Sequence, residues 1–152
     1  MTCNHFDPRC YMGTRQSFPR AVCFTISVLS TILRQKLDLG DHIAAEDDVF
    51  ITSITVSELT HGANCSLHRE DNLSRLEVLF AALTVLPFDE MAARRCGQLK
   101  AELEKQGEPL DDLDLQIASI ALVYDLPLAT NNTKHFRRVK DLKIENWIQN
   151  AK

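Results

Sequence analysis

From residue 48 onward, the apolar positions of the chain form short runs that alternate with longer stretches of helical period. Residues 49–56, VFITSITV, are rich in β-branched side chains and predict a buried strand. Further short apolar runs predict strands over 84–88, 127–130 and 142–144. Strands that alternate with helices pair in parallel and need helices on both faces of the sheet. The pattern therefore predicts an α/β fold with a doubly wound parallel sheet.

Four stretches of helical period separate these runs. Ser57 is a candidate N-cap, and Gly107 is the expected left-handed residue after the end of the third helix. The expected helices run from Ser57 to about Gly62, across 73–83, from an Asp89 cap to Gly107, and from Asp114 to about Tyr124.

The N-terminal part of the chain does not continue this pattern. Residues 28–37 predict a helix, whereas residues 1–21 mix Pro, Cys, His and Arg without a period and contain no convincing buried strand. A doubly wound domain normally begins with its central strand, so we expect the N-terminal strand to be damaged or missing. We accordingly divide the chain into a divergent segment, 1–29, that is disordered or comes from a shifted reading frame, and a domain over 30–152.

Composition restricts the class of protein. A chain of 152 residues with 45% apolar and 25% charged residues is typical of one globular domain. No apolar run is long enough to cross a bilayer, and residues 1–10 lack the features of a signal peptide, so we expect a cytoplasmic protein without a membrane anchor. The five cysteines are scattered and odd in number, which argues against a disulfide framework or a structural zinc site.

The charge distribution has one local exception. The net charge of −4 gives no overall attraction for nucleic acid, but residues 134–143 are basic. This stretch, with Lys134, Arg137 and Arg138 as candidate RNA-binding residues, can contact a phosphate backbone. A solvated surface or a partner-binding face explains the same charges equally well.

Polar side chains follow the predicted strands where a parallel sheet gathers its ligand-binding loops. Glu58 and Asn132 each come after a strand, and Asp114 opens a helix. Since Mg²⁺ and Mn²⁺ prefer oxygen ligands, Glu58 and Asp114 are candidate metal ligands. Asn132 would add an amide oxygen or orient a water, and Asp111 would assist if its helix begins early. The same residues are ordinary in helix N-termini and turns, so spacing alone leaves a structural role open.

Several motifs in order along the chain resemble those of VapC-type PIN-domain toxins. The segment ITVSELTHGA at 54–63 is similar to the family pattern I-T-x-x-E-L-x-x-G-A. Further similar segments are LTVLPFD at 83–89, LKAELEKQGEP at 99–109, DLQIA at 114–118, TNNTKHFRRV at 130–139 and IENW at 144–147. The resemblance covers roughly residues 30 to 148.

This resemblance implies a PIN-like fold and a metal-dependent endoribonuclease that cleaves RNA to arrest growth. It implies Mg²⁺ or Mn²⁺ in an acidic pocket, a cognate antitoxin protein as partner, and a homodimer. By position, Glu58 and Asp114 correspond to metal-binding carboxylates, and Asn132 corresponds to the fourth acidic position, where family members carry Asp or Asn. All three are therefore the expected catalytic residues.

The chain departs from the family at its start. Family members open with a strand that runs into L-D-T-N, whose Asp is a primary metal ligand. Counting back from Glu58 reaches residues 17–21, SFPRA, which contain no acid, and the only carboxylate before Asp38 is Asp7. The missing acid predicts weak or no catalysis. Two alternatives to the active toxin follow, which are a catalytically impaired remnant that retains antitoxin binding and a non-catalytic RNA-binding module.

Overall fold

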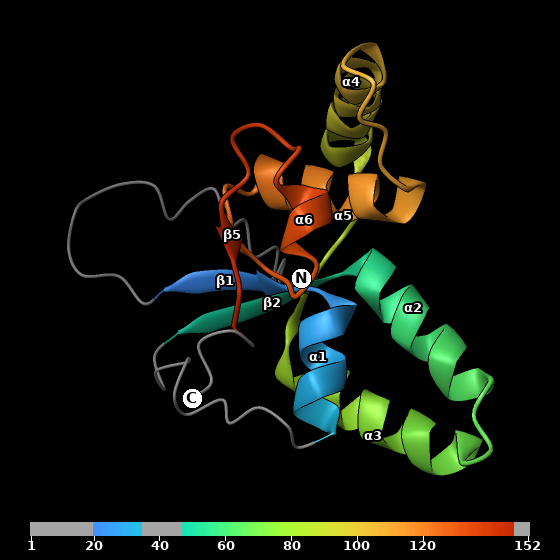
Figure 1. Ribbon diagram of the computed structural model, residues 1–152. Coiled ribbons are helices and arrows are strands. Elements are labelled where there is room, and N and C mark those ends of the chain that lie inside the picture. The colour runs from blue at the N-terminus through green and yellow to red at the C-terminus, as the bar shows by residue number, and fades with distance from the viewer. Residues whose placement is uncertain (1–19, 35–46, 148–152) are drawn as a thin grey trace.

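The structure is a computed structural model that describes residues 20–34 and 47–147. Five parallel strands form one sheet in the order β3-β2-β1-β4-β5 (Figure 1). The strands are β1 (Ala21–Phe24), β2 (Asp48–Thr52), β3 (Thr84–Leu86), β4 (Leu128–Ala129) and β5 (Ile144–Glu145). The helices are α1 (Ile26–Leu33), α2 (Ser53–Asn64), α3 (Arg69–Ala82), α4 (Glu90–Lys105), α5 (Asp112–Val123) and α6 (Thr133–Phe136). The predicted doubly wound parallel sheet is confirmed.

The centre of the sheet is β1, which pairs with β2 on one side and with β4 on the other. The expectation of a damaged or missing N-terminal strand is therefore wrong. The strand has only four residues, AVCF. We expected a longer apolar run within residues 1–21, so this short strand was missed. Both neighbours satisfy its backbone groups, so four residues are enough for the central position. The domain thus includes residues from Arg20 onward and not only from residue 30, while residues 1–19 lie outside the described part of the chain.

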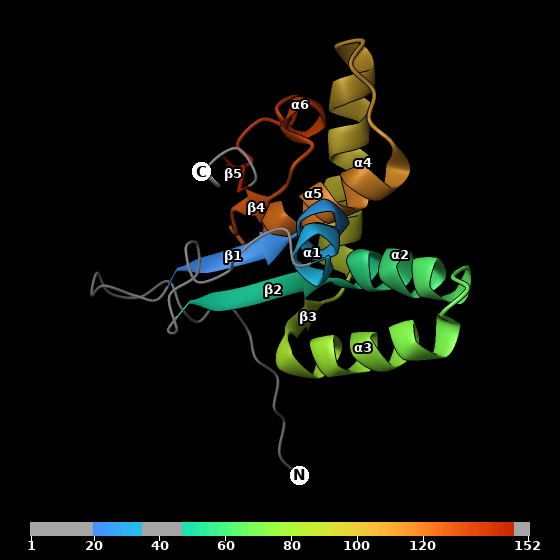
Figure 2. The same cartoon turned by 60° about the horizontal axis from the view of Figure 1, so that its bottom comes forward.

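Each face of the sheet carries its own hydrophobic core. Because successive side chains of a strand point to opposite faces, Val22 and Phe24 of β1 enter one core and Cys23 enters the other. The first core also contains residues of α1, α2 and α3, and the second contains residues of α4 and α5. Figure 2 shows these two helical layers on either side of the strands. This arrangement fixes the loops at the carboxyl ends of β1, β2 and β4.

Two helix starts differ from the sequence prediction. Strand β2 ends at Thr52, whose side chain accepts a hydrogen bond from the Thr55 amide and caps α2, so Ser57 is not the N-cap. Helix α5 is capped by Asp111 and not by Asp114, because Asp111 Oδ1 accepts from the Leu113 amide at 2.9 Å. Both helices therefore begin earlier than predicted. Glu58 falls in the second turn of α2, and Asp114 falls in the first turn of α5.

Other local predictions are confirmed. Asp89 caps α4 by accepting a hydrogen bond from the Ala92 amide at 2.9 Å. Gly107 follows the end of α4 with a φ of 71°, the left-handed conformation that glycine adopts without a steric cost. None of the helices found in 20–34 and 47–147 has the length and apolar character needed to cross a membrane.

Candidate active site at the carboxyl edge of the sheet

The carboxyl ends of three neighbouring strands deliver the polar groups of the candidate site. Thr25 directly follows β1, α2 follows β2, and residues 130–132 follow β4. In a parallel sheet these loops gather around one crevice. Helix α2 contacts both α1 and α5, so the N-terminal part of α5 adds its acidic residues to the same edge.

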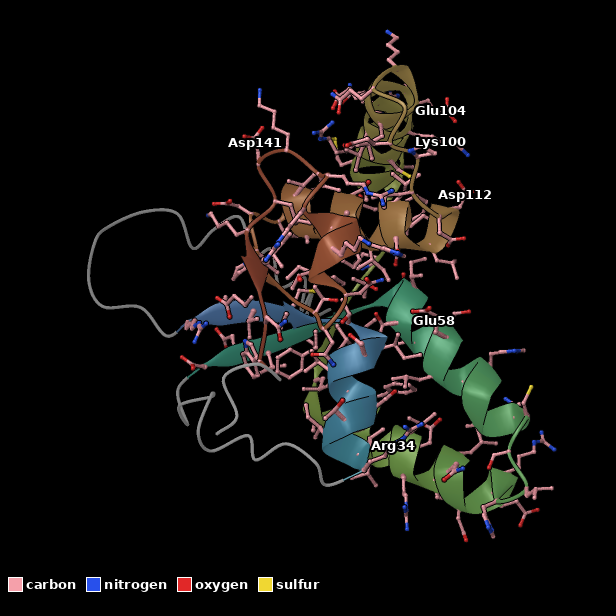
Figure 3. All side chains as sticks on the ribbon, viewed as in Figure 1. Arg34, Glu58, Lys100, Glu104, Asp112 and Asp141 are labelled. Carbon is pink, nitrogen blue, oxygen red and sulfur yellow. The ribbon has the colours of Figure 1, made fainter. Side chains whose placement is uncertain are left out.

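Glu58 is a half-buried carboxylate on α2. One of its oxygens, Oε2, is buried and has no hydrogen-bond partner among the residues that the structure describes. Burial raises the pKa of Glu58, and the negative charges of Asp114 and Asp111 raise it further. Figure 3 shows Glu58 on α2, whereas Arg34 lies at the end of α1. Burial and the neighbouring negative charges both favour the protonated form of this carboxyl group.

Asp114 lies on α5, with 24% of its side chain exposed. Its Oδ2 atom lies 3.2 Å from Nδ1 of His135, which belongs to α6. Sequence reasoning placed His135 only in the basic stretch and missed this contact. The contact fixes the orientation of Asp114 relative to the loop after β4. The negative charges of Asp114 and of the Asp111 cap both act on Glu58 of α2, and we call these three residues the acidic cluster.

The two asparagines after β4 have different environments. Asn132 is exposed, its amide donates to Thr130 Oγ1 at 3.0 Å, and its side chain makes no cap hydrogen bond. Asn131 is not one of the predicted site residues, and its side chain points inward. Its amide donates to Ser27 Oγ and its Nδ2 donates to the Ser27 carbonyl, each at 3.1 Å. Its Oδ1 is buried and has no hydrogen-bond partner within the described part of the chain.

The end of the central strand carries Thr25, which is 3% exposed. Its hydroxyl donates to the Ala129 carbonyl at 3.0 Å and lies 2.9 Å from Ser27 Oγ. Together with Asn131, these contacts join the start of α1 to the end of β4. We call Thr25, Ser27 and Asn131 the hydroxyl–amide network. No pattern in the sequence marks this network, because hydroxyl and amide residues are common in loops and no periodicity distinguishes the inward-facing ones.

The donor chemistry of this edge suits a hard divalent cation. The carboxylates of Glu58 and Asp114 and the amide oxygens of the asparagines are all oxygen ligands. Two buried oxygens, Glu58 Oε2 and Asn131 Oδ1, have no hydrogen-bond partner in the part of the chain that the structure describes. Across 20–34 and 47–147, however, no three His, Cys, Asp or Glu residues are arranged to hold a metal ion. The site fits Mg²⁺ or Mn²⁺ in the type of its ligands but is poor in ligand charge.

The predicted RNA-binding residues lie next to this edge, on α6 and just after it. Lys134 and Arg137 are exposed. Arg138 is half-buried, and its Nη1 donates to the Pro109 carbonyl at 3.0 Å, in the loop that leads to the Asp111 cap. Lys134 and Arg137 are thus available for a phosphate backbone, while Arg138 also holds the loop before α5.

A cavity of about 410 Å³ lies between α1, α2 and α3. Glu58 lines it, as does Ile26, the residue after Thr25, so the cavity reaches the candidate site. Its other lining residues include apolar side chains and two arginines, Arg34 and Arg75. The cavity therefore offers a mixed apolar and basic surface beside the acidic cluster.

Comparisons with known proteins agree with the resemblance seen in the motifs. Residues 27–142 match the family profile of the PIN domain. The tRNA(fMet)-specific endonuclease VapC of Shigella flexneri is 36% identical over 124 residues, which span 82% of this chain and 90% of that protein. Ribonuclease VapC2 of Haemophilus influenzae is 40% identical over 98 residues, 64% of this chain and 74% of that protein.

Solved structures show the same fold. The structure of VapBC-1 from nontypeable Haemophilus influenzae superposes with a TM-score of 0.76 at 26% identity and covers 84% of this chain and 98% of that chain. The DNA-bound VapBC structure from Salmonella typhimurium superposes with a TM-score of 0.71 at 32% identity and covers 86% of this chain and 99% of that chain. Both similarities extend over nearly the whole of the known chains.

Proposed function

This chain belongs to the PIN-domain family of VapC-type toxins, and from that premise we propose that it is a metal-dependent endoribonuclease toxin of a type II toxin–antitoxin pair. The observation that carries the proposal is the buried Oε2 of Glu58, which has no hydrogen-bond partner within 20–34 and 47–147 and lies beside the charges of Asp114 and Asp111. Such an arrangement is costly in a protein that binds no cation, because like charges and burial both disfavour the ionised carboxylate. A divalent cation would offset this cost.

In this proposal Glu58 and Asp114 hold Mg²⁺ or Mn²⁺. Held there, such a cation would supply Lewis-acid activation of a water and charge neutralisation at the phosphate. His135 positions Asp114 through the 3.2 Å contact between their side chains. Asn132, which is exposed, contacts the RNA or orients the attacking water. Lys134 and Arg137 attract the RNA backbone and hold it against the acidic edge, with Arg138 as a third contact.

We also propose that a cognate antitoxin protein neutralises the chain and that the chain forms a homodimer, as the family resemblance implies. Complexes named VapBC are among the similar structures, which supports an antitoxin as partner. The cavity between α1, α2 and α3 offers apolar side chains together with Arg34 and Arg75. An amphipathic, acidic segment of an antitoxin suits this surface, since it would bury apolar area and pair with both arginines.

One observation favours a second candidate function. Thr25 ends the central strand with a neutral side chain whose hydroxyl is already bonded to the Ala129 carbonyl. A site with fewer charged ligands binds a divalent cation less well. The chain would then be a catalytically impaired protein that retains antitoxin binding. Binding of an antitoxin without cleavage of RNA would distinguish this candidate from the active toxin.

The test is cleavage of RNA by the purified full-length chain with Mn²⁺ or Mg²⁺, in parallel with Asp114→Asn and with EDTA. Cleavage that both Asp114→Asn and EDTA abolish is the expected result. Asp125→Asn is the matched control, because Asp125 is exposed and has a φ of 50°, which Asn tolerates. Cleavage that persists in EDTA would refute metal dependence. No cleavage by the folded wild-type chain would refute the active toxin and leave the impaired candidate.

A further inference from the structure

The end of the central strand is the position from which a side chain reaches the middle of a parallel-sheet crevice. In this chain that position holds Thr25, between Glu58, which follows β2, and the asparagine loop, which follows β4. Ile26 and Glu58 line the same cavity, so the start of α1 and Glu58 lie side by side. A carboxylate at position 25 would therefore stand next to the acidic cluster.

The hydroxyl of Thr25 is neutral and is held by hydrogen bonds within the fold. It donates its proton to the Ala129 carbonyl and contacts Ser27 Oγ, which in turn accepts from the Asn131 amide. The Asn131 side chain completes the hydroxyl–amide network by donating to the Ser27 carbonyl. The network connects β1 to β4 with neutral groups only. It therefore stabilises the edge of the sheet without adding negative charge for a cation.

We propose that Thr25 stands as a neutral substitute where the site needs its third carboxylate, so that the wild-type chain binds a divalent cation weakly and Thr25→Asp binds it tightly. This inference rests on the proposed function, because it assumes that Glu58 and Asp114 hold the cation. Affinity for such cations increases with the number of charged oxygen ligands. The carboxylate of Thr25→Asp would add a charge beside two unpartnered buried oxygens, Glu58 Oε2 and Asn131 Oδ1.

The experiment is a titration of the full-length chain with Mn²⁺, followed by calorimetry and by the loss of the free-ion EPR signal. The variants are wild type, Thr25→Asp and Thr25→Asn. Thr25→Asn is the matched control, since Asn has the size and shape of Asp without its charge. We expect Thr25→Asp to bind Mn²⁺ at least about tenfold more tightly than wild type, and Thr25→Asn to show no gain. Adding Glu58→Gln to Thr25→Asp should remove the gain.

Equal Mn²⁺ affinity of Thr25→Asp and Thr25→Asn would overturn the inference, as would a gain that survives Glu58→Gln. A buried Asp costs stability, so thermal unfolding with and without Mn²⁺ accompanies the titration. Should Thr25→Asp not fold at any Mn²⁺ concentration, the wild-type titration decides: roughly millimolar affinity supports the inference and micromolar affinity overturns it. RNA cleavage is measured separately. Cleavage by wild type together with weak Mn²⁺ binding supports both proposals, whereas no cleavage together with a gain in Thr25→Asp refutes only the active toxin.

Discussion

At the scale of single residues, the candidate site combines the half-buried carboxylate of Glu58 with a network of neutral hydroxyl and amide groups. The predicted elements drew attention to Glu58 and Asp114, and the charge of Asp114 acts on Glu58 in the structure. Their role as metal ligands stays a prediction. Thr25, Ser27 and Asn131 were missed, because a pattern of polar residues does not say which side chains turn inward. Counting back from Glu58 reached residues 17–21, whereas the strand ends at Phe24. The spacing was therefore too imprecise to identify Thr25.

Glu58→Gln should stabilise the metal-free protein at neutral pH. The pKa of Glu58 is raised in the folded state, first by burial and then by Asp114 and Asp111. The folded state therefore binds the proton more tightly than the unfolded state. Stability is greatest below the unfolded pKa and falls as the pH rises through the folded pKa. Gln removes this loss, so the gain should be present at pH 7 and shrink toward pH 4.

Urea unfolding in EDTA at both pH values measures this effect. Glu77→Gln is the control, because Glu77 is an exposed glutamate on α3. A gain of the same size at pH 4 and pH 7, or an equal gain in Glu77→Gln, would contradict the raised pKa as its cause.

Thr25→Val should lower the free energy of unfolding by about 1 kcal/mol, the usual net value of one hydrogen bond. The substitution keeps the shape of the side chain and removes the bond to the Ala129 carbonyl. That carbonyl still accepts from the Thr25 amide at 3.1 Å, so it is not left unpaired and the loss stays modest. No cap is lost, since the Thr25 side chain makes no cap hydrogen bond to α1. Chemical denaturation measures the change in stability. The control is Thr84→Val, because Thr84 occupies an exposed position of β3. Equal stability of Thr25→Val and wild type would show that the Thr25 hydroxyl contributes nothing to the stability of the fold.

At the scale of elements, the long periodic segments and most of the strands were predicted, and the central strand β1 was not. The apolar face of α4 and the position of Gly107 after its last turn were predictable, because a helix of 16 residues repeats its hydrophobic pattern several times. Strands β4 and β5 have two residues each and lie on the strands predicted at 127–130 and 142–144, whereas β1, with four residues, was missed. Strands this short show no alternation. Tertiary pairing forms them, and a single sequence does not show which segments pair.

Chemical labelling of cysteines should confirm that β1 is the central strand. Cys23 is fully buried, and burial raises the pKa of its thiol to about 12, so almost no thiolate is present at pH 8. Cys65 is exposed at the end of α2. We expect a thiol reagent to modify Cys65 rapidly and Cys23 only after unfolding, as read by peptide mass spectrometry. Modification of Cys23 in the folded protein at the rate of Cys65 would place β1 outside the sheet.

At the scale of the whole molecule, charge is distributed unevenly around one edge of the sheet. The net charge is −4, yet the basic residues after Asn132 lie beside the acidic cluster. The contact of His135 with Asp114 and the bond from Arg138 to the Pro109 carbonyl join the two regions directly. A metal-dependent nuclease needs basic side chains beside an acidic cluster. The basic side chains attract the phosphate, and the carboxylates hold the metal that acts on it.

The salt dependence of RNA binding tests whether this basic surface serves the substrate. In an Asp114→Asn background with EDTA, we compare the chain with and without Lys134→Gln and Arg137→Gln. Each cation that contacts a phosphate of single-stranded RNA contributes about 0.7 to the slope of log K against log salt. Loss of both should therefore lower the slope by about 1.4 and weaken binding at low salt. Fluorescence anisotropy over a series of salt concentrations measures both quantities.

Arg94→Gln with Lys105→Gln is the matched control, since both residues are exposed cations on α4 and the change in net charge is the same. An equal fall in slope for the control would mean that only the overall field of the protein acts on the RNA. An unchanged slope in the Lys134 and Arg137 variant would mean that these residues serve a protein partner or the solvated surface. A fall in slope that occurs only in the Lys134 and Arg137 variant assigns the phosphate contacts to α6 and the residue that follows it. It would also explain how a protein of negative net charge holds RNA, because a surface within a Debye length of the phosphates outweighs charges farther away.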